Sequence, residues 1–326
     1  MSLNRRTFVH AGLLAAGAQS LGVAAQATLP ERPVKFVVPF APGGGADGAT
    51  RMLAEQLRVV WGGGTALVDN KPGGNTVIAV NSVLNSPRDG YTFLATIGLT
   101  MQLPYLGQKI SFDPMADFVP VGAVTVEQLV LVVNANSGIQ SFAGLVSAMK
   151  ASRKELPFAT FGIGSTAHLV AAQMGKVLQR DVLPVHYRGT APAVQALLGG
   201  EVTVALSNLG TVQQHIASGK LRAIAVLGPK RYRFIPDVPT FAELGIPGLE
   251  ILSWIGVFAA KGVPVDVIRK LGADMQKALA APELAARIHG FYQEPGAYSV
   301  AEFQSLVKRD DEVAGRLIRE HQIRIE

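Results

Sequence analysis

The segment that decides the fold lies near the start of the chain and reads Val34-Lys35-Phe36-Val37-Val38-Pro39-Phe40-Ala41-Pro42-Gly43-Gly44-Gly45-Ala46-Asp47-Gly48. Its first residues are almost continuously apolar, which is typical of a strand buried on both faces. A glycine-rich loop follows, and residues 45–60 then place apolar side chains at helical spacing. This order of strand, glycine loop and helix predicts the first unit of a largely parallel α/β sheet.

The same alternation continues along the chain. We expect further strands at residues 65–69, 91–96, 119–124, 129–134, 157–161, 183–187, 202–207, 221–227 and 254–260. We expect helices at 75–84, 142–152, 165–179, 191–198, 211–217, 265–280, 283–289 and 300–320. A brief polar interruption at 125–128 separates two of these strands.

Two blocks of this pattern, residues 34–124 and 129–227, predict two similar α/β lobes. The last 100 residues lack a sheet pattern of their own, so we expect them to return to the first lobe. Lobe 1 is then discontinuous, with residues 28–126 and 227–326, and lobe 2 spans residues 127–226. Two lobes joined by two strands form a cleft that can open and close about a hinge.

Residues 1–27 have the features of an export signal. Asn4-Arg5-Arg6-Thr7-Phe8-Val9 precedes a short apolar run rich in Ala, Gly and Leu, and Ala25-Gln26-Ala27 supplies the small residues of a cleavage site. The adjacent arginines resemble a twin-arginine signal, although an ordinary Sec signal containing Arg-Arg is the alternative. Cleavage near Ala27 would leave a soluble, exported protein and lower the formal charge from +6 to +4.

Composition excludes several classes of protein. The 326 residues contain no cysteine, which rules out a disulfide scaffold, a thiolate metal site and a cysteine nucleophile. Apolar residues make up 48% of the chain, enough for a core, so extensive disorder is excluded. The positive charge is too diffuse to indicate nucleic acid.

The first glycine loop is a candidate anion site, because backbone N–H groups at a helix N-terminus bind anions. Its candidate ligand-binding residues are Phe40, Ala41, Gly43, Gly44 and Asp47. Asp47 and Arg51 are four residues apart and can pair on the helix surface, in which case Asp47 shapes the loop. Two alternatives remain: a turn without a ligand, or a dinucleotide fingerprint, Gly43-x-Gly45-x-x-Gly48 followed by Asp69, in an exported NAD(P)-dependent oxidoreductase.

Other loops at the carboxyl ends of strands supply further candidates, since ligands bind at this edge of open α/β sheets. Ser165 or Thr166 can cap a helix or face a carboxylate. His168 is either a structural group or a base, and Arg188 either pairs with a carboxylate or lies on the surface. The candidates outside the first loop are Thr96, Gly98, Gly162, Gly164, Ser165, Thr166, His168, Tyr187, Arg188, Ser207 and Asn208.

The motifs of common catalytic centres are missing from the sequence. It has no G-x-S-x-G elbow, no H-E-x-x-H or comparable metal spacing, and no P-loop lysine. We therefore expect a binding protein without catalytic residues, metal or cofactor.

Taken in order, these segments resemble the periplasmic solute receptors of tripartite tricarboxylate transporters, also called Bug or TctC-like proteins. The similar stretches run from about residue 30 to 310 and comprise Val38–Gly44 with Asp47 and Arg51, Asp69–Gly73, Pro87–Thr92, Gly164-Ser165 with His168-Leu169, Tyr187–Gly189, Ser218–Ala223, Pro236–Thr240 with Glu243–Gly245, and Trp254-x-Gly256. Departures occur at Gly74–Ala79, which is bulkier than the family's usual turn, and at His186, where a proline is common.

The resemblance implies a type II periplasmic-binding-protein fold whose two lobes close over a small carboxylate, such as a dicarboxylate, tricarboxylate, acidic amino acid or aromatic acid. It implies that the loops at Phe40–Asp47 and Gly162–His168 line the cleft. It also implies a periplasmic monomer that delivers its ligand to inner-membrane permease subunits, with no nucleic acid partner. An extracytoplasmic partner of a sensor kinase is the alternative within the same fold.

Overall fold

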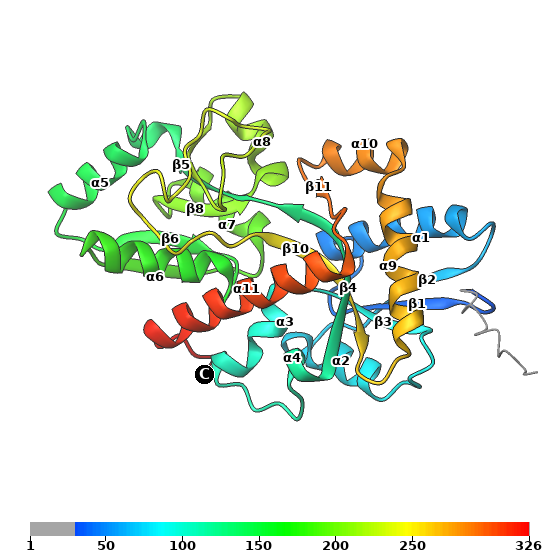
Figure 1. Cartoon of the computed structure of the whole chain (residues 1–326). Coiled ribbons are helices and arrows are strands. Elements are labelled where there is room, and N and C mark those ends of the chain that lie inside the picture. Colours follow the sequence, from blue (N-terminus) through cyan, green and yellow to red (C-terminus); the bar gives the residue numbers. More distant parts are fainter. Residues whose placement is uncertain (1–29, 326) are drawn as a thin grey trace, which may run out of the picture.

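The computed structural model describes residues 30–325, which form an α/β protein with two separate sheets (Figure 1). The first sheet belongs to lobe 1 and has the strand order β11-β4-β10-β3-β1-β2. Its strands are β1 (Val34–Val38), β2 (Ala66–Asn70), β3 (Thr92–Ile97), β4 (Phe118–Glu127), β10 (Ser253–Ala260) and β11 (Glu294–Pro295). β1 pairs in parallel with β2 and β3, whereas β10 runs antiparallel between β3 and β4.

Helices cover both faces of this sheet, as its continuously apolar strands require. One face packs against α1 (Gly45–Val60), α9 (Val265–Leu279) and α10 (Pro282–Gly290). The other face packs against α2 (Val77–Leu84), α3 (Gly98–Gln102) and α11 (Val300–Glu320). Short helical segments complete the lobe: α4 (Pro114–Asp117), η1 (Gly74–Thr76) and η2 (Leu103–Leu106).

Lobe 2 contains the second sheet, with the order β7-β6-β8-β5-β9. Its strands are β5 (Leu129–Asn134), β6 (Leu156–Thr160), β7 (Val182–His186), β8 (Val204–Asn208) and β9 (Leu221–Val226). Its helices are α5 (Phe142–Ala151), α6 (Thr166–Leu178), α7 (Thr190–Gly199) and α8 (Leu209–Ala217), and η3 (Ala135–Ser137) follows β5. One face packs against α5 and α6 and the other against α7 and α8.

The chain crosses between the sheets in two places. β4 leads into β5 with only Gln128 between them, and β9 returns to β10 through residues 227–252. Side chains of this return segment, among them Tyr232, Phe241 and Leu249, pack into the core of lobe 2. Lobe 1 therefore resumes near residue 252, which differs from the expected boundary at 227, because apolar side chains of the return segment are buried against the second sheet.

Helix α11 extends from lobe 1 toward lobe 2 (Figure 1). Phe303 near its start is buried in lobe 1, whereas Ala314, Leu317 and Ile318 near its end are buried in the core of lobe 2. The C-terminal segment thus contacts both lobes, although the sequence patterns assign all of it to lobe 1.

The α/β fold class with two lobes is confirmed. The expected export signal lies outside the described residues. Within residues 30–325, no helix combines the length and the apolar character needed to cross a membrane.

Candidate ligand-binding cleft

A cavity of about 390 Å³ opens between the two lobes, a size within the range of small-molecule sites. Lobe 1 contributes Phe40, the β3–α3 junction and the start of β10, and lobe 2 contributes the loop from β6 to α6. The lining residues are Phe40, Asn75, Ile97, Gly98, Leu99, Gln102, Phe161, Gly162, Ile163, Ser165, Thr166, Leu252, Ser253, Trp254 and Ile325.

The walls of this cavity combine apolar and neutral polar side chains. Aromatic and aliphatic residues predominate, and the polar side chains are those of Asn75, Gln102, Ser165, Thr166 and Ser253. None of the lining residues in the described chain is Lys, Arg, His, Asp or Glu. Any anion bound here therefore has to be held by backbone N–H groups, hydroxyls, amides and the partial charge of a helix terminus.

Two helices begin at the cavity, the five-residue α3 at Gly98 and the longer α6 at Thr166. Ser165 is the N-cap of α6: the Ser165 side chain accepts a hydrogen bond from the His168 N–H, and its hydroxyl donates to the carbonyl of Gly162 at 2.7 Å. The Thr166 hydroxyl, in contrast, has no hydrogen-bond partner within residues 30–325. Thr166 is therefore better suited than Ser165 to reach a ligand.

His168 has a structural role in this loop. Its Nδ1 accepts a hydrogen bond from the N–H of Gly164 at 3.2 Å, and its ring lies 4.7 Å from that of His186. Burial, followed by the proximity of His186 and His321, lowers the pKa of His168 to about 4. The ring is therefore neutral at physiological pH and keeps Nδ1 as an acceptor.

The first glycine loop is held by a buried carboxylate. Asp47 accepts hydrogen bonds from the Gly43 N–H at 2.8 Å, Arg51 Nε at 2.9 Å and Asn70 Nδ2 at 2.9 Å. Burial alone would raise the pKa of Asp47, but Arg51, Gly43 and Asn70 outweigh it and lower the pKa. Asp47 thus shapes the loop from behind, and the Gly43 N–H is occupied.

Replacing Asp47 by alanine is expected to lower the free energy of unfolding by about 2 kcal/mol, because Gly43 and Asn70 lose their acceptor. Urea denaturation measures this loss. The matched control is Arg51→Ala, whose half-exposed side chain should cost less than about 1 kcal/mol. Equal and small losses in both variants would show that the carboxylate does not organise the loop.

The cavity brings together five of the sixteen expected site residues, Phe40, Gly98, Gly162, Ser165 and Thr166. The other eleven do not line it. Thr96 is buried, its hydroxyl 2.6 Å from that of Thr100, and Asn208 donates to Glu127 at the crossing from β4 to β5. Arg188 is exposed after β7, Tyr187 is partly buried against the core of lobe 2, and Ser207 is fully buried. Ala41, Gly43, Gly44, Asp47, Gly164 and His168 flank the cavity-lining loops.

Sequence reasoning missed Gln102 and Trp254 as side chains of the cavity wall. Trp254 lies at the start of β10 and is buried. Its Nε1 donates to Asp310 at 2.9 Å, and its ring packs against Phe258 and Phe303. Gln102 ends α3, a helix too short to show in the apolar pattern. A tryptophan at the edge of an apolar strand was the only available signal.

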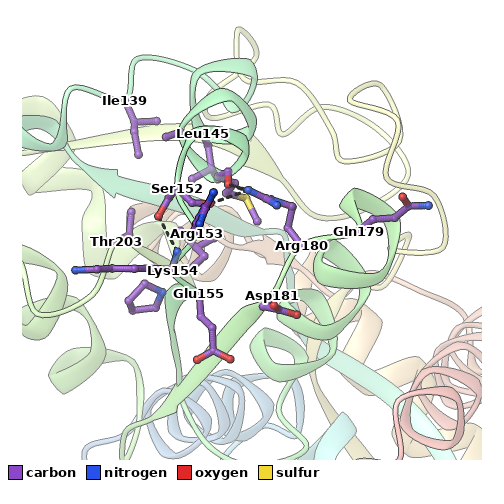
Figure 2. A pocket seen from close by; sticks show the side chains of 14 residues that line it. Ile139, Leu145, Ser152, Arg153, Lys154, Glu155, Gln179, Arg180, Asp181 and Thr203 are labelled. Atoms are coloured by element: carbon purple, nitrogen blue, oxygen red, sulfur yellow. Dashed lines mark hydrogen bonds between the residues drawn. The ribbon is translucent and has the colours of Figure 1, made fainter.

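A second cavity, of about 210 Å³, lies within lobe 2 beside the end of α5 (Figure 2). Figure 2 shows Arg180 pointing toward this helix end, where it donates to the carbonyls of Met149, Lys150 and Ser152. Its charge thus caps α5. Because only one lobe lines this cavity, we place the ligand site at the cleft between the lobes.

The fold and the cleft define a two-lobed solute-binding protein, and comparison with known proteins identifies its family. Residues 49–323 match the model of the tripartite tricarboxylate transporter family receptor. The chain belongs to this family. The sequence is 34% identical over 298 residues to the UPF0065 protein in the tcbD-tcbE intergenic region of Pseudomonas sp. (strain P51), covering 90% of this chain and 88% of the relative.

Solved structures support the same assignment. The periplasmic binding protein BugD has 31% identity and a TM-score of 0.76, covering 91% of this chain and 100% of BugD. The R. palustris protein Rpa4515 with adipate has 28% identity and a TM-score of 0.77, covering 91% of this chain and 99% of that protein.

Proposed function

We propose that this protein is a periplasmic receptor that captures a small carboxylate between its lobes and delivers it to the membrane subunits of a tripartite tricarboxylate-type transporter. The proposal rests on the cleft itself. Both lobes line it, and the N-terminus of the thirteen-residue helix α6 lies at its wall. A carboxylate suits this end of the helix because the N-terminus carries partial positive charge. Family membership and a relative whose structure holds adipate support the ligand class.

Hinge closure is the proposed mechanism of capture. The lobes are joined through the crossing at Gln128 and the return at 227–252, so they can rotate about these two connections. A ligand that touches Phe40 and Gly98 in lobe 1 and Thr166 in lobe 2 stabilises the closed arrangement, because it gains contacts there that the open one lacks.

Gly164 provides a test at the contact between the lobes. Its φ is +73°, and a Cβ at this position would lie 2.6 Å from the buried side chain of Leu106 in η2. Gly164→Ala is therefore expected to displace the β6–α6 loop and to weaken binding of carboxylates by about tenfold or more, a change of about 1.4 kcal/mol.

A thermal-shift screen with aliphatic and aromatic mono-, di- and tricarboxylates measures this binding, since a ligand at about 100 times its Kd adds about 2.7 kcal/mol of stability. Gly138→Ala is the matched control: its φ is +77°, but a Cβ would meet no atom within 4 Å. The receptor function is contradicted if no carboxylate raises the melting temperature while NAD(P) does.

Delivery to the transporter is tested by capture of the membrane subunits on ligand-loaded protein, and capture of a sensor kinase in their place would indicate signalling.

A further inference from the structure

The side chain of Gln102 is a buried amide without a partner. Only 6% of the residue is exposed, and it lines the cavity between the lobes. Its Nε2 lies 3.5 Å from the position that a Cβ on the cavity-lining Gly98 would take. No hydrogen bond joins this amide to any other residue in the described part of the chain.

The amide atoms of Gln102 are not among the fully buried, unpartnered side-chain atoms of the described residues, which are Gln213 Oε1 and Asp311 Oδ1, so they are accessible from the cavity. Polar groups in largely buried side chains nearly always have hydrogen-bond partners, and here the protein supplies none. Thr100, on the same short helix, shows the contrast, because its hydroxyl pairs with that of Thr96. Because the cavity is the open space beside Gln102, a ligand in the cavity can supply the missing partner.

The rest of the lining limits what that partner can be. A carboxylate is accommodated at the start of α6, but no charged side chain of the described residues lines the cavity. A second ionised carboxylate beside Gln102 would lose its hydration without gaining a counter-charge. Aromatic and aliphatic walls, including those of Phe161, Leu99 and Trp254, instead favour an apolar ligand body.

Given the receptor function proposed above, we propose that the preferred ligand is a monocarboxylate whose apolar body carries one uncharged hydrogen-bonding group, and that the amide of Gln102 recognises this group. An amide suits a hydroxyl because it both donates and accepts a hydrogen bond. A site with a buried amide also discriminates against an analogue that lacks the hydroxyl, since the amide then stays unpaired.

Two matched series of acids test this assignment by titration calorimetry. The first contains hexanoate, 6-hydroxyhexanoate and adipate, and the second contains benzoate, 4-hydroxybenzoate and terephthalate. Within each series the far end of the molecule changes from apolar to hydroxyl to carboxylate. In at least one series the hydroxy acid should bind about tenfold more tightly than the apolar acid, and the dicarboxylate should bind most weakly.

Gln102→Leu removes the amide with little change in volume. It should bring the Kd of the hydroxy acid level with that of the apolar acid. The melting temperature of the free protein should stay the same, because no internal hydrogen bond is lost. Gln102→Met is the second apolar variant. Gln214→Leu, at an exposed position on α8, is the control that should keep the preference.

Three outcomes would overturn the assignment while leaving a carboxylate receptor in place. They are preference for the dicarboxylate in both series, an unchanged hydroxyl preference in the Gln102 variants, and a large loss of stability in both Gln102→Leu and Gln102→Met. Failure of all six acids to bind at millimolar concentration would also overturn this assignment, whereas the receptor function is contradicted only by the outcome of the wider carboxylate screen described above.

Discussion

Replacing Trp254 by alanine is expected to lower the free energy of unfolding by about 4 kcal/mol, a typical cost for removing a buried aromatic side chain. Trp254 is 4% exposed, and its ring packs against Phe258 and Phe303 with ring centroids 5.7 and 5.6 Å away. The substitution leaves a cavity among these rings. It also leaves the buried carboxyl of Asp310 without its indole donor.

Urea denaturation followed by circular dichroism measures this loss. Trp254→Phe keeps most of the packing and isolates the hydrogen bond, so its cost should be about 1–2 kcal/mol. Trp61→Ala is the matched control, because Trp61 also donates to a carboxylate, that of Asp274 at 2.8 Å, but is only partly buried. A Trp254→Ala loss below about 2 kcal/mol, or one equal to that of Trp61→Ala, would contradict the importance of this cluster.

Glu127 gives the second large effect, which depends on pH. It ends β4 at the crossing between the lobes, where Asn208 of lobe 2 and Ser253 and Gln293 of lobe 1 donate hydrogen bonds to it. Burial raises the pKa of Glu127 from 4.5 to about 7, although these three hydrogen bonds act in the opposite direction. The folded protein therefore binds this proton more tightly than the unfolded chain does.

The contribution of Glu127 to stability accordingly falls as the pH rises from 4.5 to 7 and is constant above that range. Glu127→Gln removes this dependence while keeping an amide oxygen as acceptor. The free energy of unfolding of the variant minus that of wild type should increase by about 3 kcal/mol between pH 4.5 and pH 8.

Denaturation at a series of pH values measures this difference, in which the titration of other groups cancels. Glu283→Gln, at an exposed position on α10, is the reference for losing one carboxylate. A difference between Glu127→Gln and wild type that stays constant with pH would show that the Glu127 carboxyl does not titrate differently in the folded and unfolded states.

Local patterns were sufficient to predict most elements. Helix α1 spans Gly45–Val60 as expected, because its apolar residues recur at helical spacing and bury one face. Strands such as β5 and β10 were predicted within a residue, since continuous apolar runs bounded by polar or turn residues are typical of buried strands. The short α3, α4 and β11 were missed because they contain too few residues to show any period.

β4 shows why some boundaries could not be predicted. The polar residues at 125–128 indicated an interruption, yet β4 continues through Glu127, and Thr125 and Glu127 are buried. The carboxylate of Glu127 has a hydrogen-bond partner distant in sequence, Asn208. The return segment at 227–252 presents the same difficulty, because its packing into the core of lobe 2 depends on contacts with residues distant in sequence.

The sequence by itself determined the α/β class, the two lobes and the glycine-rich loops at strand ends, since these follow from local periodicity and from the conformations that glycine allows. The tertiary structure alone decided which loop residues face the cleft. It assigned the Gly43 N–H to Asp47 and the Ser165 hydroxyl to the cap of α6. It also left the amide of Gln102 unpaired at the cavity. Such assignments depend on which hydrogen-bond partners the folded chain brings within reach, and these partners cannot be predicted from a local sequence pattern.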